Sequence, residues 1–128
     1  MSEAQEYANH IVDLLDPFGP CEARRMFGGH GIFLQGLMFG LIADNSLYLK
    51  ADDETRSAFE AEGCDAFIYY KKDKPFQLSY YLAPDEFFED SEATLRWARL
   101  AFDAALRSPR KPKKKKSRTK KQSSATKR

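Results

Sequence analysis

The chain has 128 residues, of which 42% are hydrophobic and 13% aromatic, as expected for one globular domain with a single hydrophobic core. Its net charge of +2 combines two unlike segments: residues 1–107 carry −9, from 10 basic and 19 acidic side chains, whereas residues 108–128 carry +11 and contain no Asp or Glu. No apolar run approaches the ~20 residues needed to cross a bilayer, so the composition excludes a helical membrane protein and predicts a soluble one.

The N-terminal segment predicts an amphipathic helix. Ser2 and Gln5 have the spacing of a capping box, and apolar residues follow them at helical intervals as far as Phe18. Pro17 disfavours helical backbone at Asp16, so we expect the helix to end there.

Residues 23–50 predict an antiparallel meander of short strands, because apolar runs are separated by turn residues. Gln35-Gly36 and Asp44-Asn45 lie where two-residue hairpin turns are needed. The run 37–43 lacks polar alternation, so we expect it to be central and covered on both faces. The run 46–50 alternates, and we expect one of its sides to face water.

The second half of the domain predicts a helix, a hairpin and a final helix. A short helix capped by Asp52 or Asp53 ends before Gly63. Residues 66–70 and 76–82 predict strands joined by a lysine-rich connection. A turn of helix then starts near Pro84, and Asp90 or Ser91 caps the last helix.

These elements predict an α+β fold, with helices packed on one side of a mainly antiparallel sheet. We expect this domain to span residues 1–107. Residues 108–128 are rich in Lys and Arg and contain one apolar residue, Ala125, so we predict a disordered basic tail. Cys21 and Cys64 stand alone in the sequence and no signal peptide is evident, which indicates a reducing, cytoplasmic setting.

Several strings of residues resemble the N-terminal domain of the TfoX/Sxy family. The longest are residues 24–33 (RRMFGGHGIF), 37–44 (LMFGLIAD) and 47–50 (LYLK). Shorter ones follow in order: YYKK, SYY and WARLA, which begin at Tyr69, Ser79 and Trp97.

The resemblance implies a secretion-chaperone-like arrangement of helices on a sheet. It also implies the role of the family's namesakes, which are bacterial regulators of DNA-uptake competence that act with a cyclic-AMP-responsive activator. The namesakes carry a second, C-terminal domain, and we expect this chain to be a stand-alone N-terminal domain with the basic tail in its place. The resemblance supplies no catalytic residues.

The residues themselves predict no enzyme, cofactor or metal site. The two histidines and two cysteines are scattered without the paired spacing of zinc ligands, and nothing pairs a histidine with a nucleophile. A catalytic site assembled from dispersed residues remains an alternative, either from the carboxylates Asp52 and Asp53 or from His30, Arg24 and a carboxylate.

The segment FGGHG at residues 27–31 has closely spaced glycines, which can let backbone N–H groups approach an anion. It fits neither the dinucleotide-binding nor the P-loop spacing and leads into a strand, so we interpret it as a tight turn or bulge. Arg24 and Arg25 beside it leave a small anion contact open.

The second hairpin gathers aromatic and lysine side chains, a combination that can stack on bases and meet phosphates. Because the domain carries −9, we favour the alternative in which the aromatics fill the core and the lysines solvate the turn. A protein partner fits this hairpin equally well. The candidate partner surface comprises Arg24, Arg25, Tyr70, Lys71, Lys72 and Lys74.

The tail is the strongest functional feature of the sequence. Its 11 cations can release counterions from nucleic acid, and with no base-reading motif the binding should be nearly independent of base sequence. A tail that only aids solubility, or that folds back on the acidic domain, is the alternative. The predicted nucleic-acid-binding residues are Arg110, Lys111, Lys113, Lys114, Lys115, Lys116, Arg118, Lys120 and Lys121.

The function predicted from these features is a non-enzymatic accessory or regulatory module. It binds a protein partner through its sheet or hairpin while the tail contacts nucleic acid. The alternatives are an adaptor or homo-oligomer without a nucleic-acid role, and an uncharacterised enzyme.

Overall fold

The computed structural model describes residues 3–26 and 29–108. They form an α+β fold with one six-stranded antiparallel sheet of order β1-β2-β3-β4-β6-β5, which confirms the predicted fold class. The elements in chain order are α1 (Glu3–Leu14), β1 (Glu22–Met26), β2 (Gly29–Leu34), β3 (Leu37–Ala43), β4 (Ser46–Lys50), α2 (Arg56–Ala61), β5 (Ala66–Lys71), β6 (Lys74–Leu82), α3 (Glu86–Glu89) and α4 (Ser91–Arg107).

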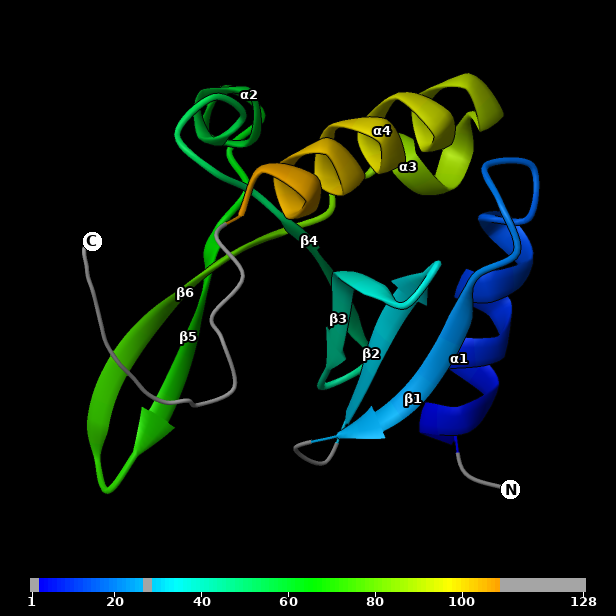
Figure 1. Ribbon diagram of the computed structural model, residues 1–128. Coiled ribbons are helices and arrows are strands. Elements are labelled where there is room, and N and C mark those ends of the chain that lie inside the picture. The colour runs from blue at the N-terminus through cyan, green and yellow to red at the C-terminus, as the bar shows by residue number, and fades with distance from the viewer. Residues whose placement is uncertain (1–2, 27–28, 109–128) are drawn as a thin grey trace, which may run out of the picture.

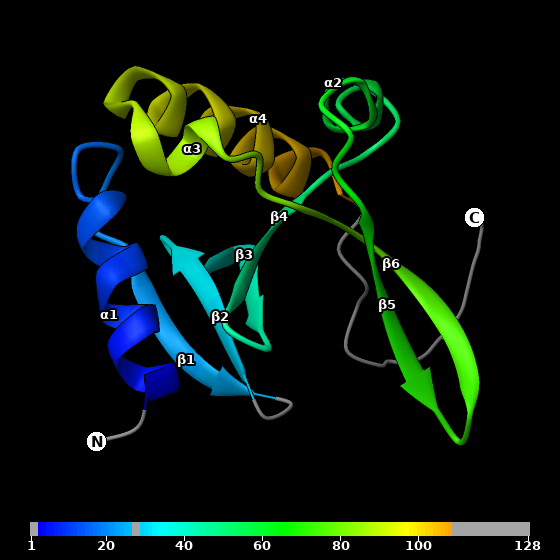
Figure 2. The ribbon, with the colours of Figure 1, turned by 180° about the vertical axis from the view of Figure 1, so that it is seen from behind.

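The helices gather on one side of the sheet (Figure 1). α1 packs against β1 and β2, α4 against β3 and β4, and α2 against β6, while α3 lies along α4. The view from behind shows the same arrangement, with α1 beside β1 (Figure 2). In the described part of the chain no helix covers the other face of the sheet, which we call the open face.

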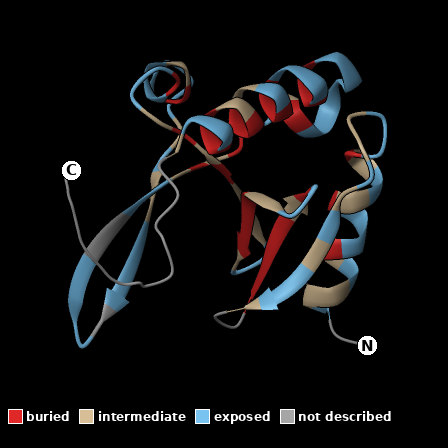
Figure 3. Ribbon diagram, in the orientation of Figure 1, coloured by how far each residue is buried: buried red, intermediate tan, exposed pale blue. Residues whose placement is uncertain are grey.

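The hydrophobic core lies between the helices and the sheet. Phe39 of β3 is fully buried, and its ring centroid lies 5.8 Å from that of Phe18 and 5.6 Å from that of Phe102 on α4. A second aromatic contact joins Phe59 of α2 to Trp97 of α4, with centroids 4.9 Å apart. Buried residues gather on β2, β3 and the inner side of α4 (Figure 3), so this layer holds the fold together.

Both predicted two-residue turns are confirmed. The φ angles are 55° and 78° at Gln35-Gly36 and 54° and 57° at Asp44-Asn45, the left-handed backbone that type I′ turns require. The second hairpin turns in the same way at Lys72-Asp73, where φ is 53° and 65°. Its connection is therefore shorter than predicted, because Lys71 and Lys74 pair as strand residues.

The first and last helices start close to their predicted positions. α1 ends at Leu14, before the predicted stop at Asp16, and its predicted capping residue Ser2 lies outside the described residues. Asp90 caps α4 as expected, because its side chain accepts a hydrogen bond from the backbone N–H of Glu92.

The second helix begins later than predicted, at Arg56. The side chain of Asp52 accepts hydrogen bonds from the backbone N–H groups of Glu54 and Thr55, and so forms a turn that precedes the helix. The predicted glycine end is confirmed, since Gly63 has φ of 75°.

β5 and β6 extend beyond the rest of the sheet as a two-stranded arm (Figures 1 and 2). β6 pairs with β4 over Tyr80–Leu82, whereas its pairing with β5 begins at Lys74. The outer residues of the arm are mostly exposed (Figure 3). An isolated two-stranded hairpin is marginally stable in water, so the arm depends on what packs against its faces.

Candidate functional site

An apolar pocket of about 260 Å³ lies between the arm and the first half of the sheet. One wall comes from β1 and β3 and the other from β5 and β6, and nearly all of the exposed lining is apolar. The lining includes Met26, Met38, Leu41, Tyr69, Leu78 and Tyr80.

The strand register places this pocket on the open face. Leu41 is the cross-strand partner of both Gly31 and Tyr48, so these three residues share a face, whereas the next residue, Ile42, belongs to the core. Tyr48 packs against Phe67 of the arm, with ring centroids 4.9 Å apart. The alternation predicted in β4 is confirmed, but its outer side is half-buried by the arm instead of facing water.

Gly31 lies between the two methionines of the pocket. A Cβ atom at this position would come within 2.6 Å of Met26 Sδ and 3.1 Å of Met38 Sδ. The missing side chain therefore lets both methionines lie over β2. Methionine is unbranched and flexible, so this wall can adapt its shape to what enters.

Charge is divided between the sheet and the rest of the domain. The six strands contain five basic residues and one acidic residue, Glu22, whereas the helices, turns and loops of residues 1–108 contain five basic and 18 acidic residues. The sheet thus carries +4 and the remainder −13, with histidine taken as neutral. Glu22 is already paired with Arg24, at 3.0 Å.

The residues predicted as a partner surface fall into two groups near opposite edges of the sheet. Arg24 and Arg25 lie on the edge strand β1. Tyr70 is 66% exposed and lies near the tip of the arm, beside the exposed Lys72 and Lys74. Lys71 pairs with Lys74 through its backbone, and its side chain lies outside the description.

The predicted nucleic-acid-binding residues, from Arg110 to Lys121, lie outside the described residues. Arg107, the last residue of α4, lies 2.7 Å from an Asp52 carboxylate oxygen and 3.2 Å from Glu54. The Arg107 hydrogen bond holds the pKa of Asp52 below its ordinary value, so this ion pair persists at neutral pH.

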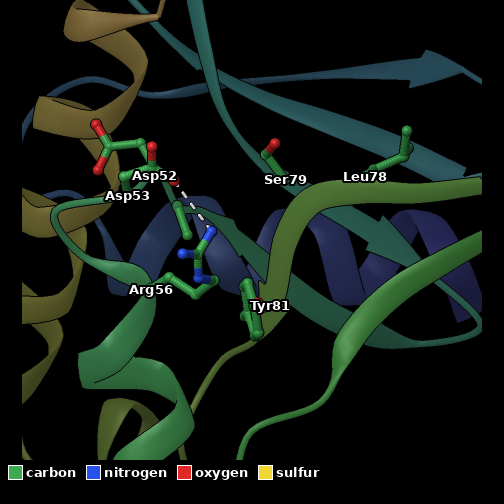
Figure 4. Close-up of a pocket in the computed structure, with 7 residues that line it drawn as sticks. Asp52, Asp53, Arg56, Leu78, Ser79 and Tyr81 are labelled. Carbon is green, nitrogen blue, oxygen red and sulfur yellow. Dashed lines mark hydrogen bonds and ion pairs between the residues drawn. The ribbon is translucent and has the colours of Figure 1, made fainter.

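A smaller polar pocket, of about 150 Å³, lies where β4, α2 and β6 meet (Figure 4). The close-up shows Arg56 directed at Asp53, with 3.0 Å between their nitrogen and oxygen atoms. The Tyr81 hydroxyl donates to Glu60 at 3.3 Å. Asp52 and Asp53 are each engaged by a different arginine, so the two carboxylates form structural ion pairs and not a matched acid and base.

His30 and Arg24 do not form a catalytic group. His30 is 3% exposed and pairs with Ile42 on the core side, and neither ring nitrogen has a hydrogen-bond partner among the described residues. Burial, with the Arg25 charge, lowers the pKa of His30, so the ring is neutral at pH 7. Arg24 pairs with Gly31 and therefore lies on the open face.

The two thiols are protonated at neutral pH. Burial and the Asp16 charge raise the pKa of Cys21 to about 11, and burial raises the pKa of Cys64. Because the thiolate is the reactive form, neither is an activated nucleophile. In residues 3–26 and 29–108 no three His, Cys, Asp or Glu side chains group as metal ligands, and no helix is long and apolar enough to cross a membrane.

Comparison with known proteins agrees with the fold. The profile of the TfoX N-terminal domain matches residues 13–105. The chain belongs to this family. It is 35% identical over 95 residues to DNA transformation protein TfoX1 of Aliivibrio fischeri, an alignment that covers 74% of this chain and 44% of the relative. It is 24% identical over 106 residues to Protein Sxy of Escherichia coli, and this alignment covers 82% of this chain and 47% of the relative. The chain thus spans about half the length of these curated relatives.

Much of the sequence that resembles the TfoX N-terminal domain lies in the fold's framework. Residues 24–33 form the β1–β2 hairpin, apart from residues 27 and 28, which lie outside the description, and residues 37–50 form the β3–β4 hairpin. Trp97 donates from Nε1 to Glu86 at 2.6 Å and joins α4 to α3. The predicted family membership is confirmed by the match over residues 13–105, and the resembling residues build the framework of this chain's fold.

The pocket on the open face is the feature that sequence reasoning missed. Met26 and Leu78 are far apart in the chain and line one pocket only because β6 inserts beside β4. One signal in the sequence could have indicated it. The strand at residues 66–71 has large apolar side chains on both faces, such as Ile68 on one and Tyr69 on the other, which predicts that both faces are covered.

Proposed function

We propose that this member of the TfoX N-terminal domain family is a non-enzymatic regulatory module. Its open face binds a protein partner, and the basic segment after residue 107 keeps the complex at nucleic acid. Its relative named DNA transformation protein TfoX1 supports a role in DNA transformation. The observation that carries the proposal is the apolar pocket beside an arm with little support from its own domain.

The exposed apolar residues of the arm support a protein partner. Tyr69 and Leu78, which line the pocket, are each 38% exposed and lie on neighbouring strands. Grouped apolar side chains on a soluble protein mark interaction surfaces, because covering them removes apolar area from water. A partner on the open face would also supply the packing that a two-stranded arm lacks.

The nucleic-acid part of the proposal predicts a strong dependence on salt. If about half of the tail's cations contact phosphate, the log-log slope of affinity against salt for duplex DNA is roughly −4 to −5. Fluorescence anisotropy with a labelled duplex measures this slope for the full chain and for a variant in which six of the eight tail lysines are glutamine: Lys113, Lys114, Lys115, Lys116, Lys120 and Lys121.

The glutamine variant should bind DNA weakly, with a slope reduced by about half. The matched control replaces Lys72 and Lys74 of the arm, which are also exposed lysines, and should keep the full slope. Equal slopes for the tail variant and the unmodified chain would show that the tail does not bind DNA.

A further inference from the structure

The size of the pocket on the open face limits what it can receive. About 260 Å³ is below the roughly 300–1,000 Å³ of typical small-molecule sites and suits one or two large apolar side chains. Its rim residues Tyr69 and Leu78 are each 38% exposed, so the pocket is reached from the open face. A protein segment that places an apolar side chain here buries surface on both molecules.

Cations lie beside the apolar lining. The Lys50 ammonium lies 5.2 Å from the ring centroid of Tyr80, a lining residue, and the Arg24 guanidinium lies 4.4 Å from the ring centroid of Phe33. Burial lowers the pKa of Lys50, which means that its charge is incompletely solvated in the fold. A carboxylate placed beside it by a partner would stabilise that charge.

Acidic residues are nearly absent from the strands. Glu22 is the one carboxylate in the six strands that the structure describes, and it is paired with Arg24. The register places Arg24, Lys50 and Lys74 on the open face beside Glu22, whereas Arg25 pairs with His30 on the core side. The positive charge of this face attracts anions, in contrast to the −13 of the helices, turns and loops.

We propose that the pocket binds an acidic amphipathic segment of a partner protein, whose apolar side chain enters between Met26 and Leu78 while its carboxylates meet Lys50 and Arg24. This rests on the proposed function, in which the open face binds a protein. A second copy of the same face would bring its own cations against Arg24, Lys50 and Lys74. Bases would leave their polar edges unpaired against the apolar lining, which is unfavourable.

The chain offers a direct probe of the pocket, because two of its three methionines, Met26 and Met38, line it. In the full-length protein labelled with 13C at the methionine methyl groups, their signals report on pocket occupancy and that of Met1 is a reference. The titrant is a synthetic 16-residue helical peptide with Leu and Phe on one face and Glu on the other. Two matched peptides replace every Glu by Lys, or every Leu and Phe by Ser.

The acidic amphipathic peptide is expected to shift the signals of Met26 and Met38. The peptide without Leu and Phe keeps the charge that binds the basic tail, and is expected to leave both signals in place.

Leu78→Thr should weaken the methyl-detected affinity about tenfold and Lys50→Gln about threefold. Leu95→Gln on α4, where Leu95 is 37% exposed, and Arg56→Gln on α2 should leave it unchanged.

The other outcomes separate the inference from the proposed function. Equal or tighter binding of the Lys peptide would overturn the acidic class of partner while leaving a protein-binding face. Absence of shifts with both amphipathic peptides would overturn the inference and remove the open face from the proposed function. Shifts caused by oligothymidylate, or by raising the protein concentration alone, would assign the pocket to nucleic acid or to a second copy.

Discussion

Gly29→Ala is expected to destabilise the domain by about 3 kcal/mol. A Cβ atom at Gly29 would lie 2.0 Å from the carbonyl oxygen of Ile42, a backbone atom at the centre of the sheet. The strands β2 and β3 would have to separate there, and their hydrogen bonds would lengthen. Urea unfolding followed by the fluorescence of Trp97, the single tryptophan, measures the change.

Gly36→Ala is the matched control for this substitution. Gly36 has φ of 78°, and no atom lies within 4 Å of the place that a Cβ would occupy, so the substitution costs only backbone strain of about 1 kcal/mol. Equal losses for the two variants would contradict the interpretation of Gly29 as a close-approach residue. A larger loss at Gly29 than at Gly36 would support the interpretation of residues 27–31 as a structural segment, because the close approach to Ile42 already accounts for the glycine.

Phe39→Ala is expected to cost about 4 kcal/mol of unfolding free energy. Phe39 is fully buried, and its ring contacts Phe18 and Phe102, so truncation leaves a cavity between β3 and α4. Phe88→Ala is the control, because Phe88 is 38% exposed and should lose less than about 1 kcal/mol. A small loss at Phe39 would mean that the helices are not held on the sheet by this aromatic cluster.

The hairpins could be predicted from the sequence because their signals are local. Asp44-Asn45 tolerates positive φ at low cost, and the apolar runs on either side fix the register by alternation. The start of the second helix could not be predicted as well. Asp52 has the chemistry of a cap, but its carboxylate accepts from the backbone N–H groups of Glu54 and Thr55 in a turn, so the helix begins only at Arg56. The same carboxylate binds Arg107, 55 residues away, a contact that leaves no local signal.

The candidate site was predicted only in part, because it depends on strand order. The sequence showed aromatic and lysine residues on the second hairpin, and the structure places Tyr70 there with 66% of its surface exposed. It did not show that β6 would pair with β4 and turn Leu78 and Tyr80 toward Met38. Contacts between distant segments leave no periodic signal in the chain. The charged residues could be counted from the sequence, but their division between basic strands and acidic helices and loops became clear only with the fold.

Urea unfolding of Leu78→Thr, compared with the unmodified chain and with Phe39→Ala, tests directly whether the open face serves binding and not folding. Threonine has the β-branched shape that strands favour, and the substitution removes the apolar side chain from the pocket rim. The expected loss is less than about 1 kcal/mol, with a cooperative transition. A loss close to that of Phe39→Ala would show that the arm and pocket belong to the folding core, and would contradict a partner-binding role for this face.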